Sequence, residues 1–294
     1  MTGEKTAKKD RDPIFTICAV IFVIAAIIAV GCWINNEYFE SSDATASDGD
    51  KVTVDYTGTY YDYLGEKNAV VFDTSYSDVG DDDSIAKSND YTAKTSYSSL
   101  SYTIGGTTVL EKFGNAVIGL KVGEKTKVYL SETEGYIGPS TDKTLNTTNN
   151  TMDASFSMPY AEFHEAYEDV TLVNDQMVKF ETKYTWDGYA VLSDNGKVVN
   201  ITYIPEVKSY EVYKSGDTTV DFVVKSVEDN TITYDIEIKN PVKVNSSEIQ
   251  MIKLDLGTDV IYITDINGDE ITYKTGSERL NQPLYFEIEL VSID

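Results

Sequence analysis

Few residues of this chain have side chains suited to nucleophilic or metal chemistry. His164 is the single histidine among 294 residues, which excludes a zinc site with several histidines. Cys18 and Cys32 are the two cysteines, and both lie in an apolar run near the N-terminus. The acidic run Asp78–Asp83 lacks the spacing of an EF-hand calcium loop. We therefore expect no cofactor and no metal, and we interpret His164 and the acidic run as surface.

The elements that would position a site alternate in the manner of β-strands. Residues 52–56, 101–104 and 125–130 alternate apolar and polar side chains, and 70–72 form a short apolar run. Val, Ile, Thr and 22 Tyr residues favour a mainly β (α+β) protein. The apolar spacing from Val109 to Leu120 predicts a short helix, and Gly123 follows it. Residues 76–99 have no clear period and are interpreted as a long loop.

Five motifs follow one another through this region. They are Val54-Asp55-Tyr56-Thr57-Gly58, Val71-Phe72-Asp73-Thr74-Ser75, Ile104-Gly105 with Val109-Leu110, Gly119-Leu120-Lys121-Val122-Gly123-Glu124-Lys125, and Gly135-Tyr136. In this order they resemble the FKBP-type peptidyl-prolyl cis-trans isomerase family over about residues 51–139. The resemblance implies an FKBP-like antiparallel half-barrel sheet around a short helix, and it implies catalysis of Xaa-Pro isomerisation.

The resemblance also implies a set of site residues. The catalytic residues would be Tyr56, Phe72, Asp73 and Tyr136, and the substrate-binding residues would be Leu100, Val109, Leu110, Phe113 and Phe286. By the same resemblance, Asp73 lies at the pocket wall near the turning amide. The Tyr136 hydroxyl and the Leu110 backbone N–H would donate hydrogen bonds to substrate carbonyls. The chain departs from the family pattern at Phe113, where the best-known members have Trp, at Leu100, where many have an aromatic residue, and at Ile137, where Gly usually follows Tyr.

A family domain needs one further strand to close its sheet. Residues 283–293 alternate as a strand and include Phe286, so residues 140–282 would be an inserted, β-rich, chaperone-like region. In SlyD-like and archaeal long-type members an insert follows the Gly-Tyr motif. Met158–Phe163 resembles the beginning of that insert, and residues 260–273, with an Asn267-Gly268 turn, resemble its last hairpin. Residues 220–238 resemble a second hairpin. Alternatively, Ile232–Ile238 closes the sheet and residues 245–294 form a separate domain.

The N-terminus carries a strongly apolar run. Residues 14–34 contain no charge and are long enough to span a bilayer as a helix. Basic residues precede the run and acidic residues follow it, which predicts a cytoplasmic tail at 1–13 and an external C-terminal part. Residues 35–50 are interpreted as a linker, and residues 51–139 plus 283–294 as the FKBP-like domain. Cleavage of the run as a signal peptide and lipidation at Cys32 stay open alternatives.

The formal charge of −25 argues against nucleic acid as a partner. Together these patterns predict a single-pass isomerase of the cell membrane that assists the folding of exported or surface proteins. Its expected partners are Xaa-Pro-containing polypeptides, unfolded client proteins and the membrane itself, through residues 14–34. The alternative is a catalytically weak FKBP scaffold that acts as a chaperone or protein-binding module on the cell surface.

Overall fold

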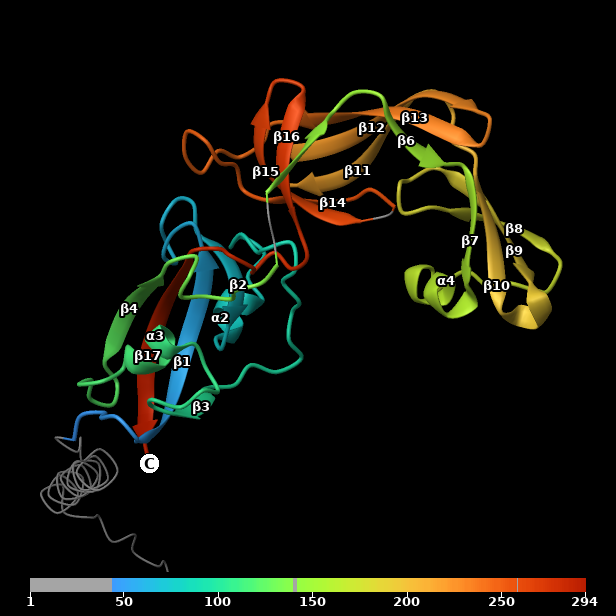
Figure 1. Cartoon of the computed structure of the whole chain (residues 1–294). Helices are drawn as coiled ribbons and strands as arrows, with labels where there is room; N and C mark the ends of the chain where they lie inside the picture. The colour runs from blue at the N-terminus through green and yellow to red at the C-terminus, as the bar shows by residue number, and fades with distance from the viewer. Residues whose placement is uncertain (1–43, 140–141, 258) are drawn as a thin grey trace, which may run out of the picture.

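The computed structural model describes residues 44–139, 142–257 and 259–294 (Figure 1). These residues form four sheets, in which all pairing between named strands is antiparallel, and three short α-helices. The prediction of a mainly β protein is therefore confirmed. The predicted transmembrane run 14–34 lies outside the described residues, and no helix within the described part is long and apolar enough to span a membrane.

The first sheet contains five strands in the order β2-β1-β17-β4, and β3 also pairs with β1. Its strands are β1 (Lys51–Tyr60), β2 (Val70–Thr74), β3 (Leu100–Thr103), β4 (Lys125–Leu130) and β17 (Leu284–Ile293). The short helices α2 (Ser77–Gly80) and α3 (Glu111–Asn115) belong to the same part. The helix expected over 109–120 is only five residues long, and the chain turns at Gly119, whose φ of +85° favours glycine.

Strand β17 occupies the centre of this sheet. Phe286 lies opposite Gly58 of β1 and opposite Val128 of β4. The alternative strand around Ile232–Ile238 belongs to β13 (Thr231–Lys239), which pairs with β12 (Thr218–Glu228) and β6 (Asn150–Asp153) in another sheet. The first sheet is thus closed by the strand that carries Phe286.

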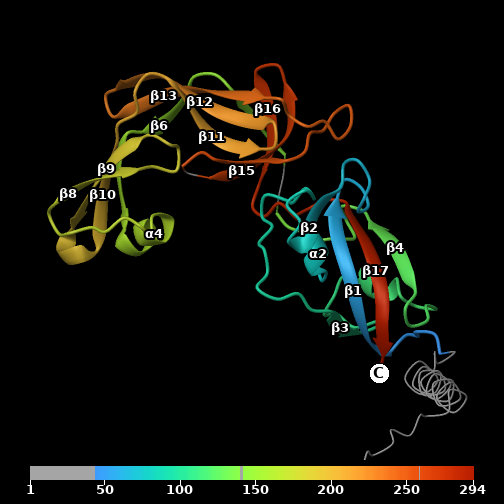
Figure 2. The same ribbon diagram turned by 180° about the vertical axis from the view of Figure 1, so that it is seen from behind.

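Three four-stranded sheets lie between β4 and β17 in the chain. The first, in the order β14-β15-β16-β5, comprises β5 (Lys143–Asn146), β14 (Ile252–Asp255), β15 (Val260–Asn267) and β16 (Glu270–Thr275). The second, β11-β12-β13-β6, adds β11 (Ser209–Ser215). The third, β7-β10-β9-β8, comprises β7 (Ser155–Pro159), β8 (Met177–Glu181), β9 (Asp187–Ser193) and β10 (Val198–Tyr203), with α4 (Tyr160–Ala166) beside it. Figures 1 and 2 show the third sheet farthest from β1 and β17.

Both hairpins expected in this region are present. Strands β15 and β16 meet at Gly268, which has a φ of +65°. Strands β12 and β13 meet at Asp229 and Asn230, which have φ values of +48° and +63°. Two consecutive positive φ values suit a two-residue hairpin loop, and Asp and Asn tolerate this conformation better than most residues.

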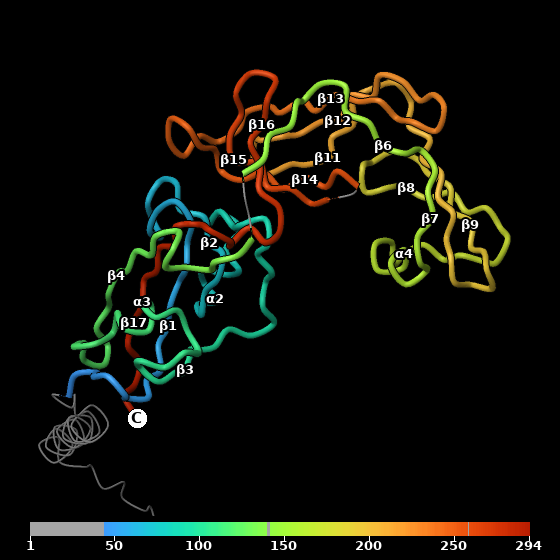
Figure 3. Tube along the Cα trace, in the orientation of Figure 1, coloured from blue at the N-terminus to red at the C-terminus, as the bar shows by residue number. Residues whose placement is uncertain are grey.

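The described residues bury two apolar cores. One belongs to the three four-stranded sheets, and the other fills the first sheet around Phe72, Phe113 and Phe286. Met251 and Tyr262 come from the later region of the chain but are buried in the core of the first sheet. The Cα trace in Figure 3 shows two connections between the first sheet and the remainder: the chain leaving after β4 and the chain returning before β17.

Candidate active site

A cavity of about 420 Å³ lies between the first sheet and α3. All nine site residues predicted from the sequence line it: Tyr56, Phe72, Asp73, Leu100, Val109, Leu110, Phe113, Tyr136 and Phe286. Thr107 and Thr108 also line the cavity and were not predicted. Strands supply five of the nine side chains, at buried or half-buried positions of β1, β2, β3 and β17.

The floor of the cavity is an aromatic cluster. Phe113 makes edge-on contacts with Tyr56, at a ring-centroid distance of 5.7 Å, and with Phe286, at 4.9 Å. Phe286 contacts Phe72 edge-on at 5.6 Å, and Tyr60 stacks on Phe72 at 4.8 Å. Edge-to-face and offset contacts are the favoured geometries for aromatic rings. The cluster therefore fixes the shape of the pocket before any ligand is bound.

Gly58 permits this close packing. A Cβ atom at Gly58 would lie 2.6 Å from Cζ of Phe72 and 2.8 Å from Cε1 of Phe286. Both rings thus occupy the volume that any larger residue at this position of β1 would need. The glycine of the Val54–Gly58 motif has a steric role in the pocket.

Asp73 is the carboxylate of the pocket wall. Its Oδ2 accepts a hydrogen bond of 2.8 Å from the Tyr56 hydroxyl, and its Oδ1 lies 2.7 Å from Nζ of Lys94. Lys94 also donates to the carbonyl oxygen of Thr74 at 2.7 Å. Burial, followed by the charge and hydrogen bond of Asp73, raises the pKa of Tyr56 well above its ordinary value. The tyrosine therefore stays protonated and donates to Asp73 at neutral pH.

Tyr136 lies at the mouth of the cavity and is 37% exposed. The backbone around it is held by residues that precede β17. Asn281 donates its backbone N–H to the carbonyl oxygen of Tyr136 at 2.8 Å, and its side chain bonds both the N–H and the carbonyl of Gly138. Ile137, which replaces the usual glycine, points outward and is 71% exposed. The departure at Ile137 therefore leaves Tyr136 at the pocket.

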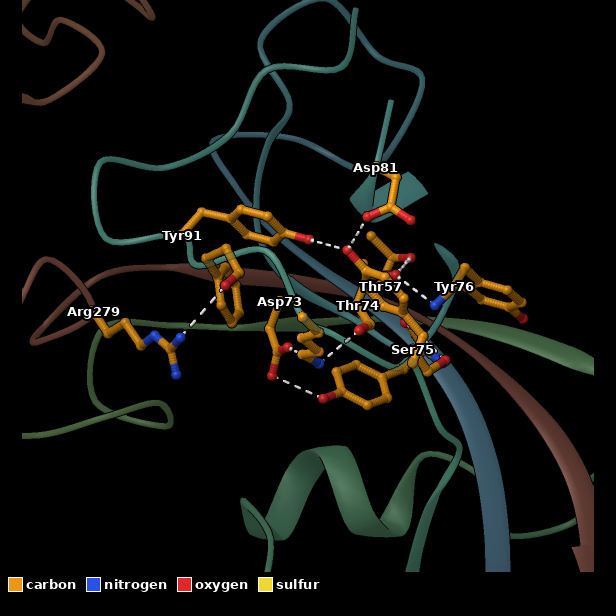
Figure 4. Close-up of polar contacts among 12 residues, drawn as sticks. Thr57, Asp73, Thr74, Ser75, Tyr76, Asp81, Tyr91 and Arg279 are labelled. Carbon is orange, nitrogen blue, oxygen red and sulfur yellow. Dashed lines mark hydrogen bonds and ion pairs between the residues drawn. The ribbon is translucent and has the colours of Figure 1, made fainter. Parts of the chain in front are cut away.

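Arg279 belongs to the residues that return from the inserted sheets, and sequence reasoning did not identify it. Its guanidinium lies over the ring of Phe72, 5.5 Å from the centroid, and donates to the Phe72 carbonyl oxygen at 3.4 Å. Figure 4 shows the side chain extending toward this part of β2. Neither Arg279 nor Lys94 belongs to a motif, so no local signal in the sequence could have placed them beside the pocket.

The arrangement suits binding of an apolar, cyclic group beside an amide. The walls are mainly aromatic and aliphatic, and the polar side chains among the lining residues are those of Asp73, Tyr56, Tyr136 and the two threonines. Within the described ranges, no group of three or more His, Cys, Asp and Glu side chains could hold a metal ion.

Comparison with known proteins agrees with this geometry. Residues 42–152 match the family model described as FKBP-type peptidyl-prolyl cis-trans isomerase. A comparison with curated proteins found no match. The matched residues include four strands of the first sheet, α3 and eight of the nine predicted site residues. This part of the chain is therefore similar to the FKBP-type peptidyl-prolyl cis-trans isomerases.

Proposed function

We propose that the protein is a membrane-anchored isomerase that assists the folding of exported or surface proteins, with its catalytic domain outside the cell. The observation that carries the catalytic part is the single cavity lined by all nine predicted side chains. The anchoring and the location rest on the sequence of residues 14–34 and the charges that flank it.

The apolar pocket explains how rotation of the amide would be accelerated. The planar Xaa-Pro amide is stabilised by resonance, and rotation must cross a barrier of about 20 kcal/mol. The twisted amide has lost this resonance and has a less polar carbonyl. Its transfer from water into an apolar pocket therefore costs less free energy than the transfer of the planar form. Such preferential binding of the twisted form lowers the barrier without a covalent intermediate. Phe72, Phe113 and Phe286 supply the apolar surface, and the Tyr136 hydroxyl can donate to a neighbouring carbonyl.

Peptide isomerisation tests the catalytic part directly. Residues 44–294 should accelerate the cis-trans exchange of an Ala-Leu-Pro-Phe peptide, measured by exchange NMR so that no coupling protease is present. Phe113→Ala should reduce the rate because it opens the floor of the cavity. Absence of exchange enhancement at protein concentrations that bind the peptide would contradict the proposal.

A second function, capture of unfolded clients, is favoured by another cavity. It has a volume of about 440 Å³ and lies among β6, β7, α4, β10 and β13. Met152, Met158, Phe156 and Tyr167 are among its lining residues, and methionine adapts well to varied apolar partners. We propose that residues 140–282 form a SlyD-like inserted region that holds clients near the isomerase pocket.

The location requires a separate experiment. Protease added to intact cells should remove everything after about residue 44 if the C-terminal part faces outward. Protection of the isomerase domain in intact cells, together with its digestion after lysis, would contradict the external location.

A further inference from the structure

Arg279 is a half-buried cation beside the pocket and has no carboxylate partner among the described residues. The other cation at this site, Lys94, is paired with Asp73 at 2.7 Å. Arg279 instead contacts Phe72, through its ring face and its backbone carbonyl. Its positive charge also acts on the nearby hydroxyls of Tyr56 and Tyr60, where it opposes the rise in their pKa. Arg279 is thus a cation beside the pocket that forms no ion pair with the described residues.

The neighbours of Arg279 fix its position. Glu278 is buried, with 3% exposure, and accepts hydrogen bonds from the Asn89 side chain at 3.0 Å and from the Asp90 N–H at 3.1 Å. Leu280 packs over Gly138, where a Cβ atom would lie 2.7 Å from Cδ2 of Leu280. Residues 278–281 therefore bridge the loop before β3 and the backbone that follows Tyr136. Arg279 is held between these two attachments, which limits the freedom of its backbone.

For a bound substrate, the nearby charge of Arg279 should affect binding more than the net negative charge of the protein does. The Debye length at physiological ionic strength is about 8 Å, so distant carboxylates are largely screened. Arg279 lies against a pocket-wall residue, and a guanidinium matches the planar geometry of a carboxylate. A substrate carboxylate bound near Phe72 would lie close to this cation, while the neighbouring carboxylate of Asp73 is paired with Lys94.

We propose that Arg279 is a specificity-determining residue that favours substrates with an acidic residue adjacent to the proline. This proposal rests on the proposed isomerase function and names the substrate class of the same pocket. The preference would be supplied by the segment that returns from the inserted sheets, and so by a part of the chain outside the region matched to the family.

Paired peptides that differ only in charge test the proposal. The first pair places Glu or Gln before proline in Ala-Xaa-Pro-Phe, and the second places Glu or Gln after it in Ala-Leu-Pro-Xaa. In exchange NMR with residues 44–294, the Glu peptide of at least one pair should isomerise roughly three to ten times faster than its Gln partner. This ratio corresponds to the free energy of a partly exposed ion pair, or to slightly more. The ratio should fall toward one in Arg279→Gln, and Arg279→Lys should retain part of it. High salt should also reduce it.

Lys208→Gln is the matched control, because it removes the same charge from a lysine that pairs with Glu206 outside the pocket lining. This variant should keep the wild-type ratio. Isothermal titration calorimetry measures peptide affinity and gives a second result that does not depend on turnover. A lack of exchange enhancement with Ala-Leu-Pro-Phe contradicts the isomerase function. Equal rates and equal affinities for Glu and Gln peptides in both pairs contradict the role of Arg279, as does an unchanged ratio in Arg279→Gln.

Discussion

At the scale of single residues, Asp73 is the polar centre of the pocket. It receives the Tyr56 hydroxyl and the Lys94 ammonium, and these two donors orient its carboxylate toward the cavity wall. The pair with Lys94 is partly exposed, with 37% and 27% of the two side chains accessible, so its contribution to the free energy of unfolding should be small. The family resemblance implies that Asp73 lies beside the turning amide, and in that position the same contacts would affect catalysis more than stability.

We expect Asp73→Ala to slow peptide exchange roughly threefold to tenfold while changing the free energy of unfolding by at most about 1 kcal/mol. Exchange NMR and urea unfolding measure the two effects on the same variant. Tyr56→Phe is the control, since it removes one donor and keeps the carboxylate. A rate in Asp73→Ala equal to that of the wild type would show that the carboxylate has no role in turnover.

The nine site residues could be predicted because each belongs to a short sequence motif of the family or follows one at a family-like distance along the chain. Lys94 and Arg279 could not. Lys94 lies in a loop without periodicity, and Arg279 is more than 200 positions beyond Phe72 in the chain. Side chains brought to a site by loops depend on tertiary contacts that leave no local pattern.

At the scale of elements, a polar cluster joins the loop before β3 to strands β14 and β15. It consists of Asn89, Asp90, Lys253, Tyr262 and Glu278. Asp90 accepts hydrogen bonds from Lys253, at 2.8 Å, and from the Tyr262 hydroxyl, at 2.7 Å, while Glu278 accepts from Asn89 and Asp90. Burial raises the pKa of Glu278 to about 7, and the hydrogen bonds from Asn89 and Asp90 oppose this rise.

This raised pKa predicts a pH-dependent stability. The folded protein retains the Glu278 proton up to about pH 7, whereas the unfolded chain loses it near its ordinary value of 4.5. The contribution of protonated Glu278 to the free energy of unfolding is therefore fully present below pH 4.5. It decreases by on the order of 3 kcal/mol as the pH rises to about 7. In Glu278→Gln, the urea concentration at the unfolding midpoint should change less between pH 5 and pH 7 than it does in the wild type.

Asp90 does not confound that experiment. Burial acts to raise its pKa, but the hydrogen bonds from Lys253 and Tyr262 outweigh burial and lower it below 3.8. Its contribution is lost only as pH falls below that value, outside the measured window. An unchanged pH profile in Glu278→Gln would mean that another group titrates between pH 5 and pH 7.

Elements with strict alternation could be predicted with nearly correct bounds. Residues 125–130 form β4 as expected. The expected hairpin joins β15 to β16, but its loop is Gly268-Asp269, one residue later than the predicted Asn267-Gly268, because Asn267 pairs with Glu270. The pairing of β5 with β16 and of β6 with β13 could not be predicted, because short polar strands such as Lys143–Asn146 and Asn150–Asp153 carry no apolar pattern. Their register depends on partners that lie far along the chain.

At the scale of the whole molecule, the isomerase domain and the region between β4 and β17 share an interface. The Tyr61 hydroxyl accepts a hydrogen bond from the Met251 N–H, and Met251 and Tyr262 are buried in the core of the first sheet. The two ends of the intervening region are also adjacent, because Asn281 bonds to Gly138. A short loop could therefore replace this region without stretching the first sheet.

We expect a variant with a Gly-Ser loop in place of residues 140–282 to fold and turn over peptides. It should be less stable than the full chain, because it exposes apolar surface that Met251 and Tyr262 cover. It should also lose refolding activity toward a protein client, which a refolding assay would measure. A fragment of residues 50–240 is the matched comparison and should fail to give a cooperative melt, because it lacks β17. Retained client refolding in the loop variant would argue against client capture by residues 140–282.

The central place of β17 also determines when the isomerase can mature during synthesis. Its partner strands β1 and β4 leave the ribosome early, but the space between them stays unfilled until the chain has been made as far as Ile293. At typical elongation rates the roughly 150 residues between Leu130 and Leu284 take on the order of 10–30 s to add. The three intervening sheets can fold during this delay. A nascent chain should thus possess its proposed client-holding region before it possesses a working catalytic pocket.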